Sequence, residues 1–405
     1  MVSTDGRHVR DEVMPIEAVV RRIMDVAHSM EPDQVPHMVA DVARAAGMRE
    51  IEVLLVDHRQ EHLTSITTSE QHKVEGSLAG DTYRRKREHV TDEGGGSQRV
   101  YAPLVDGEDR LGAMTVVVDD ATDVVVADVQ LLASITAGLI VSKQYYTDSY
   151  EFVRRLAPMD LAAEFRWALL PPLTLWTPRI RIAGMLEPAY EIAGDAYDYA
   201  VNGNVAHFAM FDAVGHGMRA CRIANLAIAT YRNCRRGRCD LTDIAKAIDD
   251  ILIDQFGESW YVTAFLGELD IERGHLRFMS AGHPLPIVLR NGKVVATLET
   301  RPGVPLGLGG EPPVVSDAQL EPDDTVFVYS DGVTEARGAG GDFFGEARLV
   351  DYLERAASDE LSPAETVRRL VGRLYEHAPA PLRDDATMLF VNWRKSDDAT
   401  DDGPG

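Results

Sequence analysis

The chain has 405 residues, 45% of them hydrophobic and 26% charged, and its formal net charge at pH 7 is −24. This length favours two ordinary domains with full cores. So much negative charge argues against nucleic acid or an anionic membrane as the main partner. No signal peptide is visible, and no apolar run approaches the roughly 20 residues that span a bilayer, so no membrane insertion is expected. The three cysteines, an odd and low number, fit a reducing cytosol and predict a cytoplasmic location.

Helical and strand patterns alternate in the first third of the chain. Apolar residues at helical spacing predict helices over 15–28, 34–46 and 124–142. Strands are predicted over 50–56, 99–104 and 112–118, and the polar stretch 68–96 is predicted to be rich in loops. This order of elements resembles a GAF domain, a small-molecule or regulatory sensor module. The resemblance implies an α/β sensor domain over 15–144 with an unknown small-molecule or protein input, and it carries over no ligand-binding residue.

A helical linker is predicted over 145–171. Pro158 interrupts its pattern and should break or kink the helix. Leu161, Phe165 and Leu169 repeat every four residues. This stripe either packs on the following domain or joins two subunits of a homodimer. At the other end of the chain, residues 396–405 are acidic and are predicted to form a disordered tail.

The most informative feature of the C-terminal half is a set of three aspartate-bearing segments. They are Phe211–Gly217, Tyr329–Gly332 and Arg383–Thr387. Each adjoins an apolar run that is predicted to be a strand, and the rigid end of a strand can hold a carboxylate in fixed geometry. Several converging carboxylates without a nearby Cys or His cluster favour hard, oxygen-loving cations such as Mg²⁺ or Mn²⁺.

A fourth acidic segment is connected to the first through a predicted β-hairpin. If Asn202-Gly203 is the two-residue turn, Asp195 lies opposite Met210. Side-chain alternation then puts Asp195 on the same face as Asp212, and Asp198 on the other face. Asp195 is therefore the better candidate for a metal centre and Asp198 for a supporting role, although a β-bulge would reverse the two.

Eight motifs in order resemble the SpoIIE-type branch of the metal-dependent (PPM) serine/threonine phosphatases. They lie at 165–171, 193–198, 212–217, 261–264, 280–284, 305–308, 330–335 and 384–387. One departure is Ala193, where the family usually has glycine and a methyl group should be tolerated. The resemblance implies an αββα sandwich over 172–395, in which two antiparallel sheets face each other between helices. The expected fold class is thus α+β, with a GAF-like domain followed by a PPM-type sandwich.

The same resemblance implies two divalent cations, Mn²⁺ or Mg²⁺, at one edge of the sandwich. Asp212 would bridge both ions, and the backbone carbonyl of Ala213 would reach one of them. Asp331 and Asp384 would complete the other site, and Asp195 would lie beside the second ion. Because such a pair of cations can clamp the phosphoryl oxygens and activate water, no Cys or Ser nucleophile is needed. Asp212, Asp331 and Asp384 are the expected catalytic residues.

Several nearby side chains are assigned supporting roles: His216, Glu335, Asp385 and Thr387, besides Asp198. His216 is either a general acid to the departing serine oxygen or a residue that holds a glycine-rich turn. Glu335 either orients Asp331 or water, or is simply solvated. Thr387 is expected to hydrogen-bond the loop that carries Asp384.

A basic run stands out in this acidic chain, at Arg232, Arg235, Arg236 and Arg238. It is either a solvated loop or a docking site for an acidic partner or a substrate phosphate. Cys234 and Cys239, which lie within and beside the run, are expected to be free thiols, because two cysteines without further ligands are a weak zinc signal.

The resemblance implies a phosphoserine/phosphothreonine protein phosphatase controlled by its sensor through the linker. Its expected substrate is a phosphorylated anti-sigma-factor antagonist in a bacterial partner-switching pathway. Two alternatives are a catalytically inactive phosphoprotein-binding or scaffold module and a two-metal hydrolase of a small phosphorylated metabolite or nucleotide. The intact acidic positions argue against the first alternative, and the absence of a Gly-x₄-Gly-Lys-Ser/Thr loop argues against nucleotide use.

Overall fold

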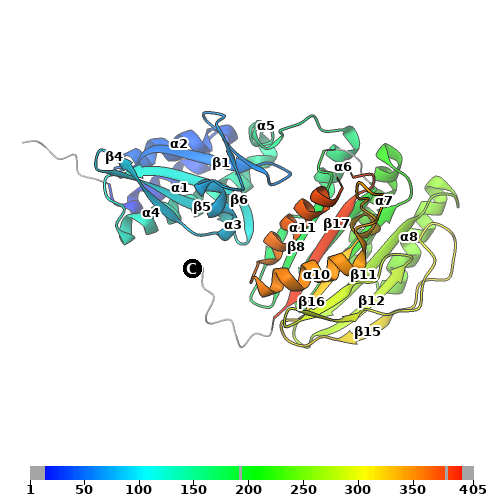
Figure 1. Ribbon diagram of the computed structural model, residues 1–405. Coiled ribbons are helices and arrows are strands. Elements are labelled where there is room, and N and C mark those ends of the chain that lie inside the picture. Colours follow the sequence, from blue (N-terminus) through cyan, green and yellow to red (C-terminus); the bar gives the residue numbers. More distant parts are fainter. Residues whose placement is uncertain (1–13, 191–193, 379–381, 395–405) are drawn as a thin grey trace, which may run out of the picture. The chain divides into compact units, whose positions relative to one another are not determined.

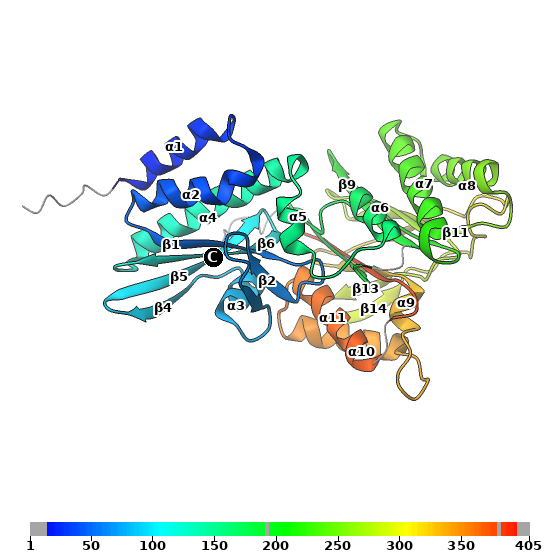
Figure 2. The same ribbon diagram turned by 90° about the horizontal axis from the view of Figure 1, so that it is seen from above.

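A computed structural model describes residues 14–190, 194–378 and 382–394. The chain divides into two compact units, Met1–Leu156 and Ala157–Gly405, and each is described by itself (Figures 1 and 2). Ala193 and the predicted tail 396–405 lie outside the described residues.

The N-terminal unit is built on a six-stranded antiparallel sheet in the order β3-β2-β1-β6-β5-β4. The strands are β1 Arg49–Val56, β2 His62–Ser65, β3 Gln71–Lys73, β4 His89–Gly94, β5 Ser97–Asp106 and β6 Asp109–Val118. Its helices are α1 Ile16–Ala27, α2 Val35–Arg44, α3 Leu78–Arg85, α4 Asp123–Lys143 and α5 Ser149–Arg154. Side chains of β1 point alternately to the two faces of the sheet, and each face has its own hydrophobic core. Val53 and Leu55 pack with α1, α2 and α4, whereas Leu54 and Val56 pack with α3. The likeness of this unit to a GAF domain stays a prediction.

The loop-rich prediction for 68–96 is wrong, because this segment contains β3, α3 and β4. Helix α3 begins at Ser77, whose hydroxyl accepts a hydrogen bond from the N–H of Gly80 at 3.0 Å. Its buried face consists of small residues and Tyr83, whose hydroxyl donates to Gln60 at 2.8 Å. Small residues and a hydrogen-bonded tyrosine give no apolar periodicity, so hydrophobic spacing does not reveal this helix.

Helix α4 and the turn after it, Asp123–Tyr146, are apolar enough and long enough to cross a membrane by length and composition alone. The expectation that no apolar run approaches this length is therefore wrong. Of the most apolar window, 33% is buried inside the structure, and Val129, Leu132 and Ile140 belong to the core of the unit. Since core helices pass the same test, this is weak evidence for a membrane span.

The C-terminal unit is an αββα sandwich, as predicted. A five-stranded sheet has the order β15-β12-β11-β10-β9, and a six-stranded sheet has the order β14-β13-β16-β17-β8-β7. The strands are β7 Thr174–Trp176, β8 Ile180–Glu187, β9 Asp195–Asn202, β10 Val205–Ala213, β11 Val262–Asp270, β12 His275–Ala281, β13 Ile287–Arg290, β14 Lys293–Thr297, β15 Ser316–Gln319, β16 Thr325–Tyr329 and β17 Ala386–Trp393. The helices are α6 Leu161–Leu169, α7 Gly217–Arg236, α8 Leu241–Phe256, α9 Asp331–Thr334, α10 Gly345–Ser358 and α11 Pro363–His377. Helices α7 and α8 cover the outer face of the first sheet, and α10 and α11 cover the second (Figure 1).

Alternation along the strands decides which residues face the space between the sheets. In β10, Phe208 and Met210 pack in the core between the sheets, whereas Ala209 and Phe211 pack against α7 and α8. Asp212 continues the inner face at the end of this strand. The Asp212 carboxylate therefore lies at the edge of the space between the two sheets.

The segment before the sandwich is broken near Pro158, since α5 ends at Arg154 and α6 begins at Leu161. Helix α6 buries Ala162, Ala163 and Arg166. Leu161 and Phe165 are 63% and 51% exposed, so the prediction that they pack on the following domain is wrong. The homodimer alternative stays a prediction.

Candidate metal centre

The β9–β10 hairpin sets the position of the first two carboxylates. Asn202 pairs with Val205, so the turn residues are Gly203 and Asn204 rather than Asn202 and Gly203. Gly203 has a φ of +60°, the conformation that a type II′ turn requires at its first central position. The shift moves the partner of Asp195 from Met210 to Asp212.

Four aspartates meet where β10 and β16 end and where β9 and β17 begin. Asp195 and Asp212 lie directly opposite each other across the hairpin. Asp331 is the first residue of α9, immediately after β16, and Asp384 lies two residues before β17. The charges of Asp331 and Asp384 act on Asp212, and that of Asp212 acts on Asp195. We call Asp195, Asp212, Asp331 and Asp384 the acidic edge.

Crowding at the acidic edge disfavours the ionised carboxylates. Burial, followed by the charges of Asp331 and Asp384, raises the pKa of Asp212 to about 7. Burial and neighbouring carboxylates raise the pKa of Asp384 to about 6, and they raise the pKa of Asp195 as well. A group of carboxylates with raised pKa values gains most from a nearby cation, because a cation restores the charged forms.

The donor set fits a divalent cation. Asp195 is buried, and within the described chain its Oδ2 atom has no hydrogen-bond partner. Carboxylate oxygens are the ligands that Mg²⁺ and Mn²⁺ prefer. No three of these carboxylates bring one oxygen each within 4.8 Å of one another; among the described residues that spacing of ligand atoms occurs only for Glu52, Glu70 and His72 in the N-terminal unit. Wider spacing suits Mg²⁺-like ions, which keep several waters and use few protein ligands each.

Asp385 does not extend the acidic edge but holds its backbone. Its Oδ2 accepts hydrogen bonds from the N–H groups of Gly194 at 2.6 Å and Asp195 at 3.0 Å. Its Oδ1 accepts from Nη1 of the buried Arg166 at 3.1 Å, and Nη2 of Arg166 donates to the carbonyl of Pro188 at 2.7 Å. Arg166 therefore connects α6 to the start of β9. Sequence reasoning missed this role, although an arginine among Ala162 and Ala163 on one helix face was an available signal.

The Asp331-Gly332 pair is not a simple turn. A Cβ atom at Gly332 would lie 2.0 Å from the carbonyl oxygen of Asp385. The two backbone segments that carry Asp331 and Asp384 thus approach so closely that only glycine fits.

We expect Gly332→Ala to lower metal-dependent activity at least about tenfold and to destabilise the unit by about 1–3 kcal/mol, because backbone must move to admit the methyl group. Thermal unfolding and turnover of an aryl phosphate would measure the two effects. Gly372→Ala is the matched control, because Gly372 lies in α11 with no atom within 4 Å of an added Cβ. It should keep activity and gain up to about 1 kcal/mol. Equal turnover and equal unfolding midpoints for the two variants would contradict the inference that only glycine fits at position 332.

Three other predicted site residues, Ala213, His216 and Glu335, differ in their exposure and hydrogen bonding. Ala213 ends β10, and its N–H donates to the carbonyl of Gly194 at 3.0 Å. His216 is exposed and precedes α7 without a side-chain capping bond. Glu335 is exposed, and its charge contributes to the raised pKa of Asp384.

Thr387 was expected to hydrogen-bond the loop that carries Asp384, but its backbone hydrogen bonds join it to Ser330. Its backbone N–H donates to Ser330 Oγ at 3.0 Å, and its carbonyl accepts from the N–H of Ser330 at 3.0 Å. Thr387 thus fastens β17 to the residue before Asp331.

Asp198 lies on the opposite face of β9, as alternation predicted. It is buried against α7, where Oδ1 accepts from Arg232 Nη2 at 2.6 Å and Oδ2 accepts from Arg235 Nη1 at 2.8 Å. The description of Arg232 and Arg235 as a solvated loop is therefore wrong, because both belong to α7 and are ion-paired. Cys234 and Cys239 are free thiols, as expected.

Residues 202–394, which make up most of the C-terminal unit, match the model of the family described as Stage II sporulation protein E (SpoIIE). The similarity to the SpoIIE-type PPM phosphatase domains thus covers this unit and not the N-terminal one.

Two curated relatives are similar to this chain. "Protein IcfG" of Synechocystis sp. is 24% identical over 252 residues, which cover 55% of this chain and 38% of that protein. "Phosphoserine phosphatase RsbU" of Bacillus subtilis is 22% identical over 235 residues, which cover 58% of this chain and 69% of that protein. Among solved structures, the SiaA-PP2C domain of Pseudomonas aeruginosa matches with a TM-score of 0.49 and 23% identity, over 57% of this chain and 94% of that one. The chain thus spans well under half the length of the first of these relatives.

Proposed function

We propose that this protein is a divalent-metal-dependent phosphoserine/phosphothreonine protein phosphatase. The observation that carries the proposal is the acidic edge, in which Asp195 and Asp212 face each other and Asp331 and Asp384 act electrostatically on Asp212. The match of 202–394 to the SpoIIE family model and the similarity to a phosphoserine phosphatase support it.

Each residue has a definite task in this proposal. Asp195, Asp212, Asp331 and Asp384, with the carbonyl of Ala213, would hold two ions, Mn²⁺ or Mg²⁺. Such ions, when bound, neutralise phosphoryl charge and activate water for in-line attack. Asp385 and Arg166 fix the backbone of Asp195, and Ser330 and Thr387 fix the strand ends beside Asp331.

Among the described residues, no exposed thiol competes as a nucleophile near this edge. Cys221 is buried, and its Sγ donates to the carbonyl of Ala162 at 3.3 Å. Burial raises the pKa of this thiol, which keeps it protonated and poorly nucleophilic. Hydrolysis by activated water is therefore the proposed chemistry.

Turnover of p-nitrophenyl phosphate by the full chain, in EDTA, Mg²⁺ or Mn²⁺, tests the activity. Metal-dependent turnover supports the phosphatase. Binding of a phosphoprotein without turnover in any metal would favour an inactive binding module. Faster turnover of small phosphorylated metabolites than of phosphoserine peptides would favour a small-molecule hydrolase.

Mn²⁺ is expected to raise the thermal unfolding midpoint of the C-terminal unit, because the cation relieves repulsion within the acidic edge. At a metal concentration of about 100 Kd the gain is about 2.7 kcal/mol. Asp212→Asn should reduce this shift, whereas His72→Ala, which dismantles the Glu52, Glu70 and His72 group of the other unit, should not. A shift that depends on His72 and is unaffected by Asp212→Asn would place the metal elsewhere.

The remaining proposals concern regulation. The domains would be a GAF-like sensor over 15–144, a linker over 145–171 and the phosphatase domain over 172–395. The substrate would be a phosphorylated anti-sigma-factor antagonist of a partner-switching pathway, and a cytoplasmic location would suit it. The exposed Leu161 and Phe165 support a homodimer contact through α6. Sedimentation of the full chain and of Phe165→Ser would test that contact.

A further inference from the structure

Two arginines near the start of α7 differ in their surroundings from Arg232 and Arg235 in its last turns. Within the described chain, Arg219 and Arg222 are exposed and form no ion pair, whereas Arg232 and Arg235 are bound to Asp198. Arg219 lies over the ring of Trp260 at 4.4 Å from its centroid, and Arg222 lies over Phe256 at 5.5 Å. Both guanidinium groups thus rest on aromatic rings and not on carboxylates.

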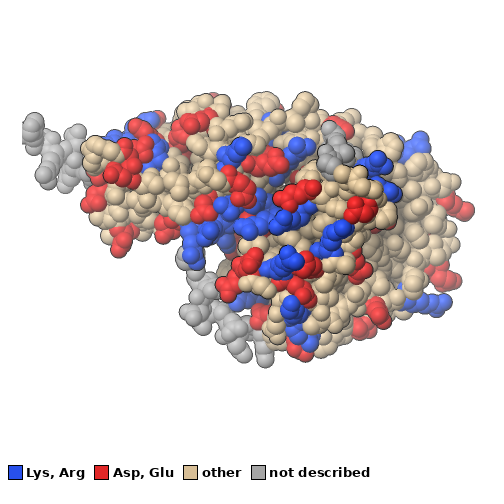
Figure 3. Space-filling view, in the orientation of Figure 1, with Lys and Arg blue, Asp and Glu red and all other residues tan. Residues whose placement is uncertain are grey.

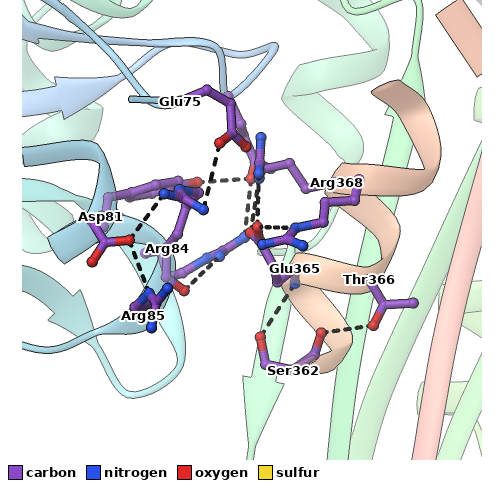
Figure 4. Close-up of polar contacts among 12 residues, drawn as sticks. Glu75, Asp81, Arg84, Arg85, Ser362, Glu365, Thr366 and Arg368 are labelled. Carbon is purple, nitrogen blue, oxygen red and sulfur yellow. Dashed lines mark hydrogen bonds and ion pairs between the residues drawn. The ribbon is translucent and has the colours of Figure 1, made fainter. Parts of the chain in front are cut away.

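Most arginines elsewhere in this unit are neutralised locally. Figure 3 shows acidic and basic side chains interleaved over α10 and α11, where Arg355 pairs with Asp351 and Arg373 with Glu376. Figure 4 shows Arg368 beside Glu365, with Nη2 donating to Oε1 at 2.7 Å. Arg219 and Arg222 thus belong to the smaller group of arginines of this unit that form no ion pair among the described residues, in a chain of net charge −24.

Arg219 lies close to the acidic edge along the chain and in space. Helix α7 begins at Gly217, five residues after Asp212, and Arg219 belongs to its first turn. Side chains of a helix lean toward its N-terminus, which here is the 215–217 loop. The ring of Trp260 lies beside the same loop, since a Cβ added at Gly215 would be 3.6 Å from its Cζ3 atom.

The sheet fixes the position of Trp260. It lies two residues before β11, in which Val262 pairs with Ala213 and Thr263 pairs with Asp212. The N–H of Val214 donates to the carbonyl of Tyr261 at 3.1 Å, which joins this segment to the chain just after Asp212. The ring that carries Arg219 is thereby held beside the acidic edge.

A guanidinium stacked on a ring keeps its in-plane N–H groups free and pre-oriented, and these can bind a phosphate or carboxylate through two parallel hydrogen bonds. We propose that Arg219, held on Trp260, is a substrate-binding residue that receives an oxyanion of the phosphopeptide next to the acidic edge. This inference rests on the proposed phosphatase function. It assigns the start of α7 as the side from which an anionic substrate approaches, where positive charge offsets the repulsion of four carboxylates.

Arg219→Met, which keeps an apolar stem on Trp260, tests the proposal by steady-state kinetics. The substrates are p-nitrophenyl phosphate and two synthetic phosphoserine peptides with neutral or acidic flanking residues. We expect KM to rise roughly five- to thirtyfold, with kcat changed much less, because a charge-assisted contact to the substrate is lost. A rise for all three substrates means that Arg219 holds the phosphoryl group; a rise for the acidic peptide alone means that it holds a flanking carboxylate.

Arg236→Met is the matched control, because Arg236 is an exposed arginine of the same helix, about 26 Å away along its axis. Its KM values should equal those of the parent. Arg219→Lys keeps the charge without the planar fork and should recover only part of the loss. Unchanged KM for all three substrates in Arg219→Met, or a loss confined to kcat, overturns the proposal.

Binding separates this inference from the proposed function. Fluorescence polarisation of the labelled acidic phosphopeptide, on full-length Asp212→Asn with and without Arg219→Met, requires no turnover. Weaker binding of the double variant supports the role of Arg219 even where the parent chain hydrolyses nothing. Equal binding of the two proteins overturns it even where the parent chain is an active phosphatase.

Discussion

Asp212→Asn is expected to lower metal-dependent turnover of p-nitrophenyl phosphate by about 10²–10³-fold or more, down to the level measured in EDTA. Asp212 is the one acidic-edge residue on which the charges of Asp331 and Asp384 both act and which also faces Asp195. Its loss should therefore weaken every cation position that the edge can offer. Initial rates against Mn²⁺ concentration measure the effect and show whether excess metal restores any activity.

A folding defect would give the same loss, so stability must be measured beside it. Because burial and neighbouring carboxylates raise the pKa of Asp212 to about 7, its ionised form destabilises the metal-free fold at higher pH. Asp212→Asn should then unfold at a higher temperature than the parent in EDTA. Asp317→Asn, an exposed change on edge strand β15 of the same sheet, is the activity control. Metal-dependent turnover that survives Asp212→Asn would contradict the assignment.

Strand periodicity predicted the faces of the hairpin correctly even though its register was wrong. Moving the turn by one residue shifts the pairing partner of Asp195 by two positions, from Met210 to Asp212. Side chains alternate with a period of two, so a shift of two leaves every residue on the same face. Asp195 and Asp198 were therefore assigned to the correct sides, and the true register brings Asp195 closer to Asp212 than predicted.

The features that the sequence did not reveal depend on contacts between distant segments. Arg166 and Asp385 are 219 positions apart, and no local pattern connects them. The spacing of Leu161, Phe165 and Leu169 predicted the wrong buried face of α6. The buried face consists of Ala162, Ala163 and Arg166, because Arg166 forms an ion pair with Asp385. Likewise α3 is held by Tyr83, whose hydroxyl bonds Gln60 23 residues away. Local hydrophobic periodicity predicts where helices and strands occur, whereas such long-range polar contacts determine which face of a helix is buried.

Arg166→Met is expected to destabilise the C-terminal unit by about 3–5 kcal/mol, because Asp385 would be left buried without its cationic partner. For a domain of this size the thermal midpoint should fall by about 6–20 °C. Activity should fall as well at temperatures where the fold persists, since Asp385 fixes the N–H groups of Gly194 and Asp195.

Two further variants distinguish the effect of breaking the buried Arg166–Asp385 pair from the effect of losing any arginine. Arg166→Met combined with Asp385→Asn should recover much of the lost stability, because the amide oxygen can still accept a hydrogen bond and no buried charge remains. Arg348→Met removes an arginine from a solvent-exposed pair with Asp342 and should cost at most about 1 kcal/mol. Equal unfolding midpoints for Arg166→Met and Arg348→Met would show that α6 does not stabilise the acidic edge through Asp385. A large loss for Arg166→Met that the second substitution relieves would establish this link between the helix and the start of β9.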